Sequence, residues 1–451
     1  MSLTRRERLL YSSSSFGGEA LSRARSTWLV FFYAPPPDAD MEELLPLGLV
    51  GVLLFVANLI EALDDPLIGF WSDRTRSRWG RRLPFIIGAT PLWALFAVLL
   101  FMPPPNASIA LTAAYLFLMF ELHHLFGTMT SGPYESLMPE IARSNRERLS
   151  IVGMRVYFGA AGALVGLVGS GLLVDFANFQ VMAAAMAALG LISRYVGAFG
   201  VWKHAAASRT TAEISLKESL RLTFENRYFV LFLPTFVLFS AGLQMMLGVL
   251  PFYASAILET ESEGTWVAIL TATAIAVQLA TVPAYQRYAR RHSKRRAYRV
   301  AMMLGVITFP FLALGGLLPA VPVEAQTIVL LALAGLPLAG VFLFPAALTA
   351  DIVDYDTRLT GMRREASYFG SQNFVEKTAT SFAPLLVALI LLLGNTANNS
   401  LGVRLVGPVA AILVLIGLWI FRGYDLEDDV STATPAPTAP GGPQADTRKG
   451  G

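Results

Sequence analysis

Long runs of apolar residues, separated by short polar segments, recur from one end of the 451-residue chain to the other. A helix needs about 20 consecutive apolar residues to cross the hydrocarbon core of a bilayer. The pattern predicts twelve membrane-spanning helices, at 11–33, 44–71, 83–102, 109–132, 149–174, 179–202, 228–255, 264–286, 298–318, 325–350, 366–394 and 402–421. We therefore expect an all-α polytopic membrane protein.

The first of these spans is the most polar. It contains Ser12 to Ser15, Glu19, Arg23 and Arg25. A helix of this kind is stable in a membrane only when its polar side faces other helices or water. We expect it to lie inside the bundle.

Composition supports a membrane protein and excludes several other classes. The chain is 54% hydrophobic and 15% charged, whereas a soluble domain carries about 25% charged residues. It has no cysteine and only four histidines, which leaves little for a disulfide, a thiolate metal site or a membrane enzyme. It also lacks a glycine-rich phosphate loop, so transport driven by ATP is not expected, nor is any cofactor beyond a coupling ion.

The charges of the loops predict the orientation. Four loops contain no lysine or arginine: 35–43, 103–108, 175–180 and 259–263. The alternate loops are basic, above all 74–82 and 287–299. Because positively charged loops stay on the cytoplasmic side, we expect both termini in the cytoplasm and the protein in the cell (inner) membrane.

A repeat divides the chain. The basic loop after the second span has a counterpart after the eighth, roughly 215 residues later. We expect a six-helix bundle at 1–202, a cytoplasmic linker at 203–227, a second six-helix bundle at 228–424 and a disordered cytoplasmic tail at 425–451. Two six-helix halves are typical of the major facilitator fold, in which the solute site lies between the halves near the middle of the membrane.

Three acids lie in the second span: Glu61, Asp64 and Asp65. Residues three and four apart share a helix face, so these carboxylates project to one side. Counted back from Asp73 at ~1.5 Å per residue, Glu61 lies ~18 Å inside the boundary. Acids at that depth bind ions or protons, or pair with a neighbouring helix for packing alone.

The stretch from Glu61 to Arg82 resembles the glycoside–pentoside–hexuronide cation symporters (melibiose permease-like) of the major facilitator superfamily. Its core reads Glu61-Ala-Leu-Asp-Asp-Pro-Leu-Ile-Gly-Phe, followed by Ser-Asp-Arg-Thr-Arg-Ser-Arg-Trp-Gly-Arg-Arg. The segments 133–139, 350–355 and 368–377 add to the resemblance, which covers nearly the whole chain. It implies transport of a sugar-like solute together with Na⁺, Li⁺ or H⁺. A lysolipid-transporting branch shares part of the pattern.

The resemblance implies six site residues: Glu19, Glu61, Asp65, Thr128, Arg155 and Lys377. Position along the spans adds the others named below, and the alternative for Arg23 is that it only neutralises Glu19, four residues earlier. Candidate cation-binding residues are Glu61, Asp65, Asp64, Thr128 and Lys377. Candidate solute-binding residues are Glu19, Arg155, Lys377, Asn373 and Arg23. We expect Asp73, Arg74, Asp351 and Asp354 to act in gating near the cytoplasmic ends of their helices.

Depth along the helices gives an independent argument. Glu19, Glu61, Arg155 and Lys377 lie 11, 12, 7 and 13 residues from the nearest cytoplasmic charges, or ~10–20 Å of helix. Unpaired charges at that depth are costly, so we expect these side chains to pair with one another. For Lys377, a purely structural salt bridge between the halves is the alternative.

Two departures from the family pattern affect the coupling ion and the sugar site. Ser131 stands where the family has an acid, and Glu135 where it has an aromatic residue. With a carboxylate ligand missing, we favour H⁺ over Na⁺, although Na⁺ at Glu61 and Asp65 stays open. Desolvation and repulsion between like charges favour a protonated carboxyl. Glu121, His123 and His124 are candidates for a proton relay or for packing alone.

We therefore expect a secondary active transporter that symports a cation and a sugar or glycoside-like solute by alternating access. The alternatives are a lysolipid or amphiphile transporter of the same superfamily, and a non-transporting membrane receptor or scaffold. The expected partners are the small solute and membrane lipid, with no nucleic acid. We expect a monomer.

Overall fold

The computed structural model of the protein describes residues 3–39, 41–75, 77, 79–80, 82–141, 145–207, 223–360 and 365–426. Within these residues the regular structure is helical throughout. The first six predicted spans correspond to α1 (Arg5–Tyr33), α2 (Leu47–Arg74), α3 (Leu83–Leu99), α4 (Ile109–Ile141), α5 (Asn145–Leu164) with α6 (Ser170–Phe176), and α7 (Phe179–Gly200). The short helix α8 (Trp202–Ala207) follows.

The last six predicted spans also correspond to helices of the structure. They are α10 (Arg227–Leu258), α11 (Glu263–Arg291), α12 (Lys294–Thr308), α13 (Val323–Gly335) with α14 (Leu338–Thr360), α15 (Glu365–Thr380) with α16 (Phe382–Leu391), and α17 (Leu401–Ile420). A π-helical turn, Val165–Gly169, joins α5 to α6, and a 3-10 turn, Phe309–Leu314, follows α12. Residues 208–222 of the predicted linker and 427–451 of the predicted tail lie outside the described residues, and the domain boundaries stay a prediction.

The predicted fold class is confirmed. Among the described residues, nine helical segments are long and apolar enough to cross a membrane, and the shorter apolar helices Leu47–Glu61 and Leu83–Leu99 accompany them. Helix α1 is longer than expected, because it begins at Arg5 rather than at residue 11. Thr4 caps it: the Thr4 hydroxyl accepts from the Glu7 backbone N–H at 3.2 Å, and the Glu7 carboxylate accepts from the Thr4 N–H at 2.8 Å.

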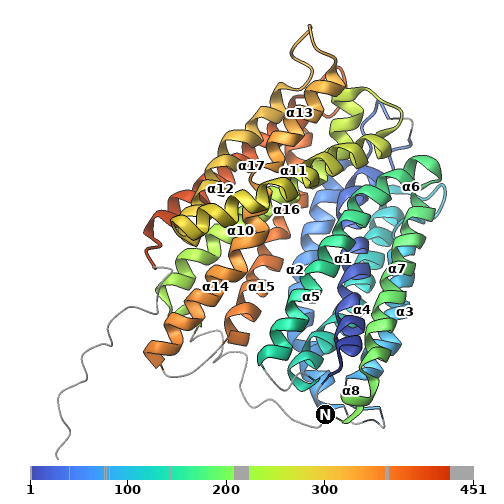
Figure 1. Ribbon diagram of the computed structural model, residues 1–451. Helices are drawn as coiled ribbons and strands as arrows, with labels where there is room; N and C mark the ends of the chain where they lie inside the picture. Colours follow the sequence, from blue (N-terminus) through green and yellow to red (C-terminus); the bar gives the residue numbers. More distant parts are fainter. Residues whose placement is uncertain are drawn as a thin grey trace, which may run out of the picture.

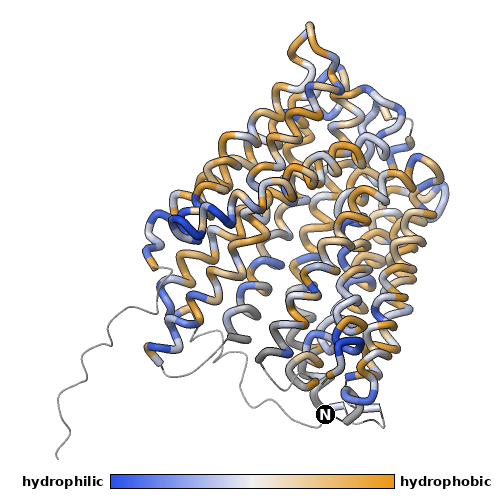
Figure 2. The backbone as a smooth tube through the Cα atoms, in the orientation of Figure 1, coloured by the Kyte–Doolittle hydropathy of each residue, from blue (hydrophilic) through white to orange (hydrophobic). Residues whose placement is uncertain are grey.

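Figure 1 shows two groups of helices side by side, α1 to α8 and α10 to α17, with the amino terminus at one end of the first group. Hydrophobic residues cover most of each helix, while hydrophilic residues gather near the helix ends and at a few points along their length (Figure 2). These inner hydrophilic points mark the region of the candidate site.

Helix α1 is buried between α5 and α7 because small residues let the backbones approach closely. A Cβ atom on Gly17 would lie 2.1 Å from the carbonyl oxygen of Leu189 in α7, and one on Gly166 would lie 2.3 Å from that of Ala20. Both positions therefore need glycine. The middle of the polar α1 is thus enclosed by protein, as its composition predicts, and Glu19 and Arg25 line the interior cavity.

The two groups of helices touch near the loops that lack basic residues, here called the acidic end (loops 34–46, 100–108, 177–178, 259–262, 315–322 and 392–400). The Asp175 carboxylate, in the last turn of α6, accepts hydrogen bonds from the backbone N–H groups of Gly264 (2.8 Å) and Thr265 (2.5 Å) at the start of α11. A carboxylate is favourable at a helix amino terminus. Phe31 of α1 also stacks edge-on against Phe252 of α10, with centroids 5.2 Å apart. These contacts link the groups at one end of the bundle.

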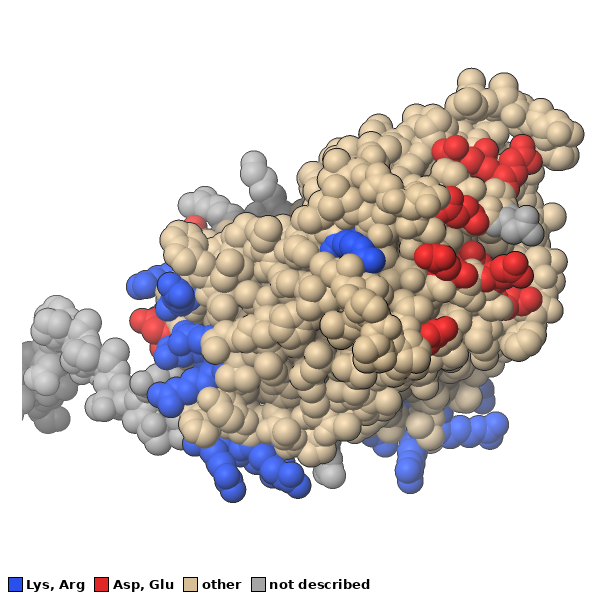
Figure 3. All heavy atoms as spheres, turned by 90° about the horizontal axis from the view of Figure 1, so that it is seen from above, with Lys and Arg blue, Asp and Glu red and all other residues tan. Residues whose placement is uncertain are grey.

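The charges of the described residues follow the same axis. In the end-on view of Figure 3, acidic side chains gather on the acidic end, while most of the visible basic side chains lie around its margin. The opposite end, called the basic end, carries the loops around residues 75–82 and 291–294. This asymmetry agrees with the loop charges in the sequence.

Helices α2 and α16 approach closely enough for a disulfide test. A Cβ atom on Gly51 would lie 2.6 Å from the Cβ of Ala388. The two helices therefore need to move apart only slightly for the Cβ atoms of two cysteines to reach the ~3.8 Å that disulfides favour. Because the natural chain has no cysteine, the double variant Gly51→Cys, Ala388→Cys should form an intramolecular cross-link on mild oxidation. Intact-mass analysis with and without reductant measures it. The single variants are the controls, and a double variant that keeps two free thiols would contradict this packing.

Candidate functional site

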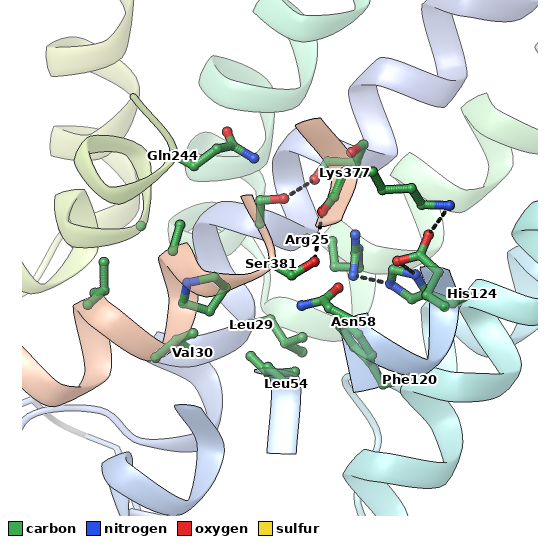
Figure 4. Close-up of a pocket in the computed structure, with 17 residues that line it drawn as sticks. Arg25, Leu29, Val30, Leu54, Asn58, Phe120, His124, Gln244, Lys377 and Ser381 are labelled. Atoms are coloured by element: carbon green, nitrogen blue, oxygen red, sulfur yellow. Dashed lines mark hydrogen bonds and ion pairs between the residues drawn. The ribbon is translucent and has the colours of Figure 1, made fainter. Parts of the chain in front are cut away.

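The interior contains a cavity with two adjoining lobes. Lobe A measures about 290 Å³ and lobe B about 320 Å³. Both are lined by Ser22, Arg25, Glu61, His124 and Lys377, which therefore form the boundary between them. Figure 4 shows Lys377, His124 and Arg25 converging on one side of lobe A, with Leu29, Val30 and Leu54 away from them. The charged residues of the membrane interior thus meet where the lobes meet.

Glu61 is the centre of this boundary. It is only 8% exposed, and both carboxylate oxygens are occupied. The Lys377 Nζ lies 2.7 Å from Oε1, and the His124 Nδ1 contacts Oε2. Glu61 comes from α2, His124 from α4 and Lys377 from α15, so one carboxylate binds the two groups of helices together.

The second nitrogen of His124 fixes its tautomer. Arg25 Nη1, which has only hydrogens to give, lies 2.8 Å from His124 Nε2, so Nε2 is the acceptor. The imidazole hydrogen is then on Nδ1, where it is donated to Glu61. The Arg25 guanidinium lies 4.9 Å from the Phe120 ring, which stacks on His124. A neutral His124 therefore connects Arg25 to Glu61, and a doubly protonated imidazole would conflict with Arg25.

Local structure holds Lys377 in place. It lies one turn before the break between α15 and α16, where the Ser381 hydroxyl donates to the Lys377 carbonyl at 2.7 Å. This hydrogen bond ties the last turn of α15 to the residue that begins the break. The lysine side chain then reaches across the group boundary to α2.

A second cluster lies along α1 and α10. Arg23 Nε is 3.4 Å from the Glu19 carboxylate, four residues earlier on the same helix, and Arg23 Nη1 donates to Gln244 Oε1 at 3.1 Å. Arg23 is therefore both the neutralising partner of Glu19 and a bridge to α10. Glu19 also lines lobe B, and Gln244 lines lobe A.

A third cluster lies in lobe B around Arg155 of α5. Its guanidinium forms a two-pronged pair with the Glu135 carboxylate of α4, with Nη1 at 2.5 Å from Oε2. Its Nε donates to the Ser15 hydroxyl at 3.1 Å. Two-pronged pairs are strong and directional. The expectation that Glu19, Glu61, Arg155 and Lys377 pair with one another holds for Glu61 with Lys377. It is wrong for Arg155, which pairs with Glu135, the residue that replaces an aromatic one in the family pattern.

The other predicted positions divide into three sets. Thr128 and Ser131 line lobe B, as does His123, whose Nδ1 lies 3.1 Å from the Trp93 carbonyl. Asp351 lies away from the cavity, 2.5 Å from Lys294 of α12, and Asp354 is exposed near the same end of α14. The side chains of Asp64, Asp65, Asp73, Arg74 and Asn373 lie outside the described part of the structure. The gating roles stay predictions.

The structure adds three residues that the sequence reasoning did not assign to the site. They are Arg25, Gln244 and Arg194. For the two arginines a signal existed, since a basic side chain inside a membrane span is a candidate functional residue by default. For Gln244 there was no such signal, because the role of a neutral amide in an apolar helix depends on which residue of a neighbouring helix it contacts.

A sodium ion at Glu61 would compete with the side chains that already contact this acid. No group of three or more histidine, aspartate or glutamate residues is placed to hold a metal ion in that part of the chain. Both oxygens of Glu61 already accept from nitrogen donors. A sodium ion there would have to displace Lys377 or His124.

Comparisons with known proteins now identify the family. A family model described as MFS/sugar transport protein matches residues 10–428. The chain belongs to this family. The isoprimeverose transporter of Lactiplantibacillus pentosus is 23% identical over 403 residues, which cover 87% of this chain and 81% of that protein. The sodium-dependent lysophosphatidylcholine symporter 1 of Gallus gallus is 24% identical, covering 86% of this chain and 81% of its own length.

Solved structures agree at the level of the fold. The crystal structure of the nucleoside transporter NupG superimposes with a TM-score of 0.64 at 13% identity, covering 93% of this chain and 98% of that one. As a member of the MFS/sugar transport family, the protein is a multi-pass membrane protein and a secondary transporter of a small solute. It is not an enzyme, and the receptor or scaffold alternative gives way to transport. The predicted resemblance is confirmed.

The Glu61–Lys377 pair makes a measurable prediction. Each of Glu61→Gln and Lys377→Gln leaves one charge without its partner inside the protein, so each should lower the free energy of unfolding. The double variant should be destabilised by less than the sum of the two, with a coupling of about 0.5–3 kcal/mol, the range for residues in contact. Denaturant titration in detergent micelles measures this.

A matched cycle controls for the substitutions themselves. Lys294 pairs with Asp351 and not with Glu61, so Lys294→Gln combined with Glu61→Gln should be additive within about 0.5 kcal/mol. Additive behaviour of Glu61→Gln with Lys377→Gln would show that the ion pair does not stabilise the folded state.

Proposed function

We propose that this member of the MFS/sugar transport family is a proton-coupled symporter of a sugar or glycoside-like solute that works by alternating access. The observation that carries the proposal is the position of Glu61. Its carboxylate lines both lobes of the cavity and holds a lysine from the other group of helices. A proton on Glu61 and a solute in the cavity therefore act on the same bridge between the groups.

Protonation of Glu61 would weaken that bridge directly. A neutral carboxyl loses its charge attraction to Lys377, and its added hydrogen needs an acceptor where two donors now point. His124 is a poorer site for the incoming proton, because Arg25 already donates to its free nitrogen. Because Lys377 and His124 stabilise the ionised carboxylate, Glu61 takes up a proton only when the lysine and the histidine rearrange. This supports H⁺ over Na⁺ as the coupling ion.

The cavity suits a solute with many hydroxyl groups. Lobe B offers acceptors and donors of both signs, among them Glu19 and Arg155, beside the indole of Trp93. A sugar hydroxyl both donates and accepts, and charged partners strengthen such hydrogen bonds. The isoprimeverose transporter among the relatives supports this solute class. Candidate solute contacts are Glu19, Arg155, Lys377, Arg23 and Asn373.

An amphiphile such as a lysolipid is the second candidate. Lobe A is partly apolar, with Leu29, Val30, Leu54 and Phe120 along its wall, and one relative is named as a lysophosphatidylcholine symporter. A glycoside with an apolar aglycone would use the same wall. We favour the glycoside, because more charged residues line lobe B than one lipid headgroup needs as partners.

The loop charges support an orientation with the basic end and both termini in the cytoplasm of a bacterial inner membrane. One relative of Escherichia coli is named as an inner membrane symporter. In this orientation the contacts of Asp175 and Phe31 join the two groups of helices on the outward side.

The coupling ion is tested by uptake into proteoliposomes with an imposed ion gradient and clamped voltage. We expect a pH gradient, acidic outside, to drive accumulation of a verified glycoside without sodium, and a sodium gradient at constant pH to drive none. Radiolabelled or chromogenic glycoside inside the vesicles is the readout. Accumulation driven by sodium alone would replace H⁺ by Na⁺ in the mechanism.

Variants of Glu61 locate the coupling. Glu61→Gln should abolish accumulation but keep exchange of glycoside across the membrane, because the neutral amide cannot exchange a proton. Glu43→Gln, at an exposed acid of the acidic end, should accumulate solute like the natural protein. Normal accumulation by Glu61→Gln would remove Glu61 from coupling.

The solute site makes a separate prediction. Hydrogen bonds to charged groups are typically worth ~1.5–3 kcal/mol each, so Glu19→Ala or Arg155→Ala should weaken glycoside binding by roughly one to two orders of magnitude. Calorimetric titration of the purified variants measures this, with thermal unfolding as the check on folding. If both variants are folded and bind a verified glycoside with natural affinity, the contacts lie elsewhere.

A further inference from the structure

Arg194 of α7 has no part in the proton-coupling cluster, yet it lines lobe B. The residue is only 8% exposed, and its Nε is buried with no hydrogen-bond partner. Its guanidinium lies over two aromatic rings, 4.7 Å from Tyr134 and 5.9 Å from Trp93. A permanently charged group is therefore held inside the protein against ring faces.

Two polar groups near Arg194 are already used by other partners. The Tyr134 hydroxyl donates to the Tyr11 carbonyl at 2.6 Å, and the Glu135 carboxylate is held by both prongs of Arg155. Cation–π contacts repay only part of the desolvation of a guanidinium. Arg194 thus keeps hydrogen-bonding capacity for a group that arrives in lobe B.

The charged side chains around lobe B also favour an anion. Its described lining holds four cationic side chains, Arg25, Arg155, Arg194 and Lys377, and three anionic ones, Glu19, Glu61 and Glu135. The described lining therefore carries an excess positive charge. Arg155 and Lys377 are each paired with one of these acids, which leaves Arg194 as a cation of the lobe whose described contacts are aromatic.

The Arg194 guanidinium faces α1 at a position that has no side chain. A Cβ atom on Gly18, which also lines lobe B, would lie 3.9 Å from Arg194 Nη2. Because Gly18 has no side chain, nothing from that position covers the guanidinium. Trp93 lines the same lobe and presents an indole ring beside it.

We propose that Arg194, with Trp93 and Tyr134 beside it, forms a subsite of lobe B that binds an anionic oxyacid group, a carboxylate or a phosphate, of the transported solute. The inference rests on the proposed transport function and narrows its solute class. Planar guanidinium groups bind such anions through two parallel hydrogen bonds. A neutral solute would leave Arg194 as it is, so the subsite discriminates by charge.

The test uses two glycosides that differ only at C6. p-Nitrophenyl β-D-glucuronide carries a carboxylate where p-nitrophenyl β-D-glucoside carries a hydroxymethyl group. Binding to the purified full-length protein in lipid nanodiscs is measured by calorimetry. We expect the glucuronide to bind about tenfold to a hundredfold more tightly than the glucoside, as a charged, two-pronged contact implies.

Variants of Arg194 assign that preference. Arg194→Gln should remove the preference for the glucuronide while leaving glucoside affinity within about threefold, and Arg194→Lys should restore part of it, because an ammonium keeps the charge but loses the fork. Arg404→Gln is the matched control. Arg404 donates to the carbonyls of Ala313 and Gly315 at the acidic end, outside both lobes, so this variant should keep the full preference.

Lysophosphatidylcholine distinguishes the source of the anion. Binding of this lipid that Arg194→Gln weakens tenfold, without glycoside binding, would support the phosphate form of the subsite and overturn the glycoside proposal. Equal affinity of the natural protein for glucuronide and glucoside, or a preference that survives Arg194→Gln, would overturn the subsite while leaving glycoside transport standing. If none of the three probes binds, both the anion subsite and the proposed glycoside transport would be overturned.

Discussion

A carboxylate buried in a membrane protein must be surrounded by donors, and Glu61 meets this requirement with side chains from two other helices. Lys377 reaches it from α15 and His124 from α4. The Lys377 side chain is 35% exposed, so removing one partner costs less than the ~3–5 kcal/mol of a fully buried pair but more than a surface ion pair. The position of α2 relative to α15 is therefore tied to the ionisation of one acid.

The same requirement explains how the interior is ordered around Glu61. His124 donates to the acid with Nδ1 because Arg25 donates to Nε2, and Arg25 is held over the ring of Phe120. A change at Glu61 therefore passes through His124 to a side chain that lines both lobes. The contacts are contiguous, so no displacement of whole helices is needed to connect the acid to the solute cavity.

Much of this fold follows from the sequence, because the bilayer imposes a length on each apolar run. The boundaries were less accurate: α1 begins at Arg5 through its Thr4 cap, and the tenth span divides into α13 and α14 and extends to Thr360. For the site, depth along the helices placed Glu61 and Lys377 at one level, and they do meet. The partners of Arg155 and His124 were not predictable, because Glu135 and Arg25 come from other helices whose rotation only packing determines.

The charges at the lobe boundary connect the proton to the solute. Among the described side chains there, Lys377 and Arg25 are positive, Glu61 is negative and His124 is neutral, so protonation of Glu61 adds an uncompensated positive charge. An anionic group of the solute would offset that charge: two unit charges ~8 Å apart at an effective dielectric constant of ~20 attract by ~2 kcal/mol, about 30-fold in affinity. By linkage, the proton raises the affinity for the anion and the anion raises the affinity for the proton by the same factor. A protonatable acid among fixed cations is therefore sufficient to couple a proton to an anionic solute.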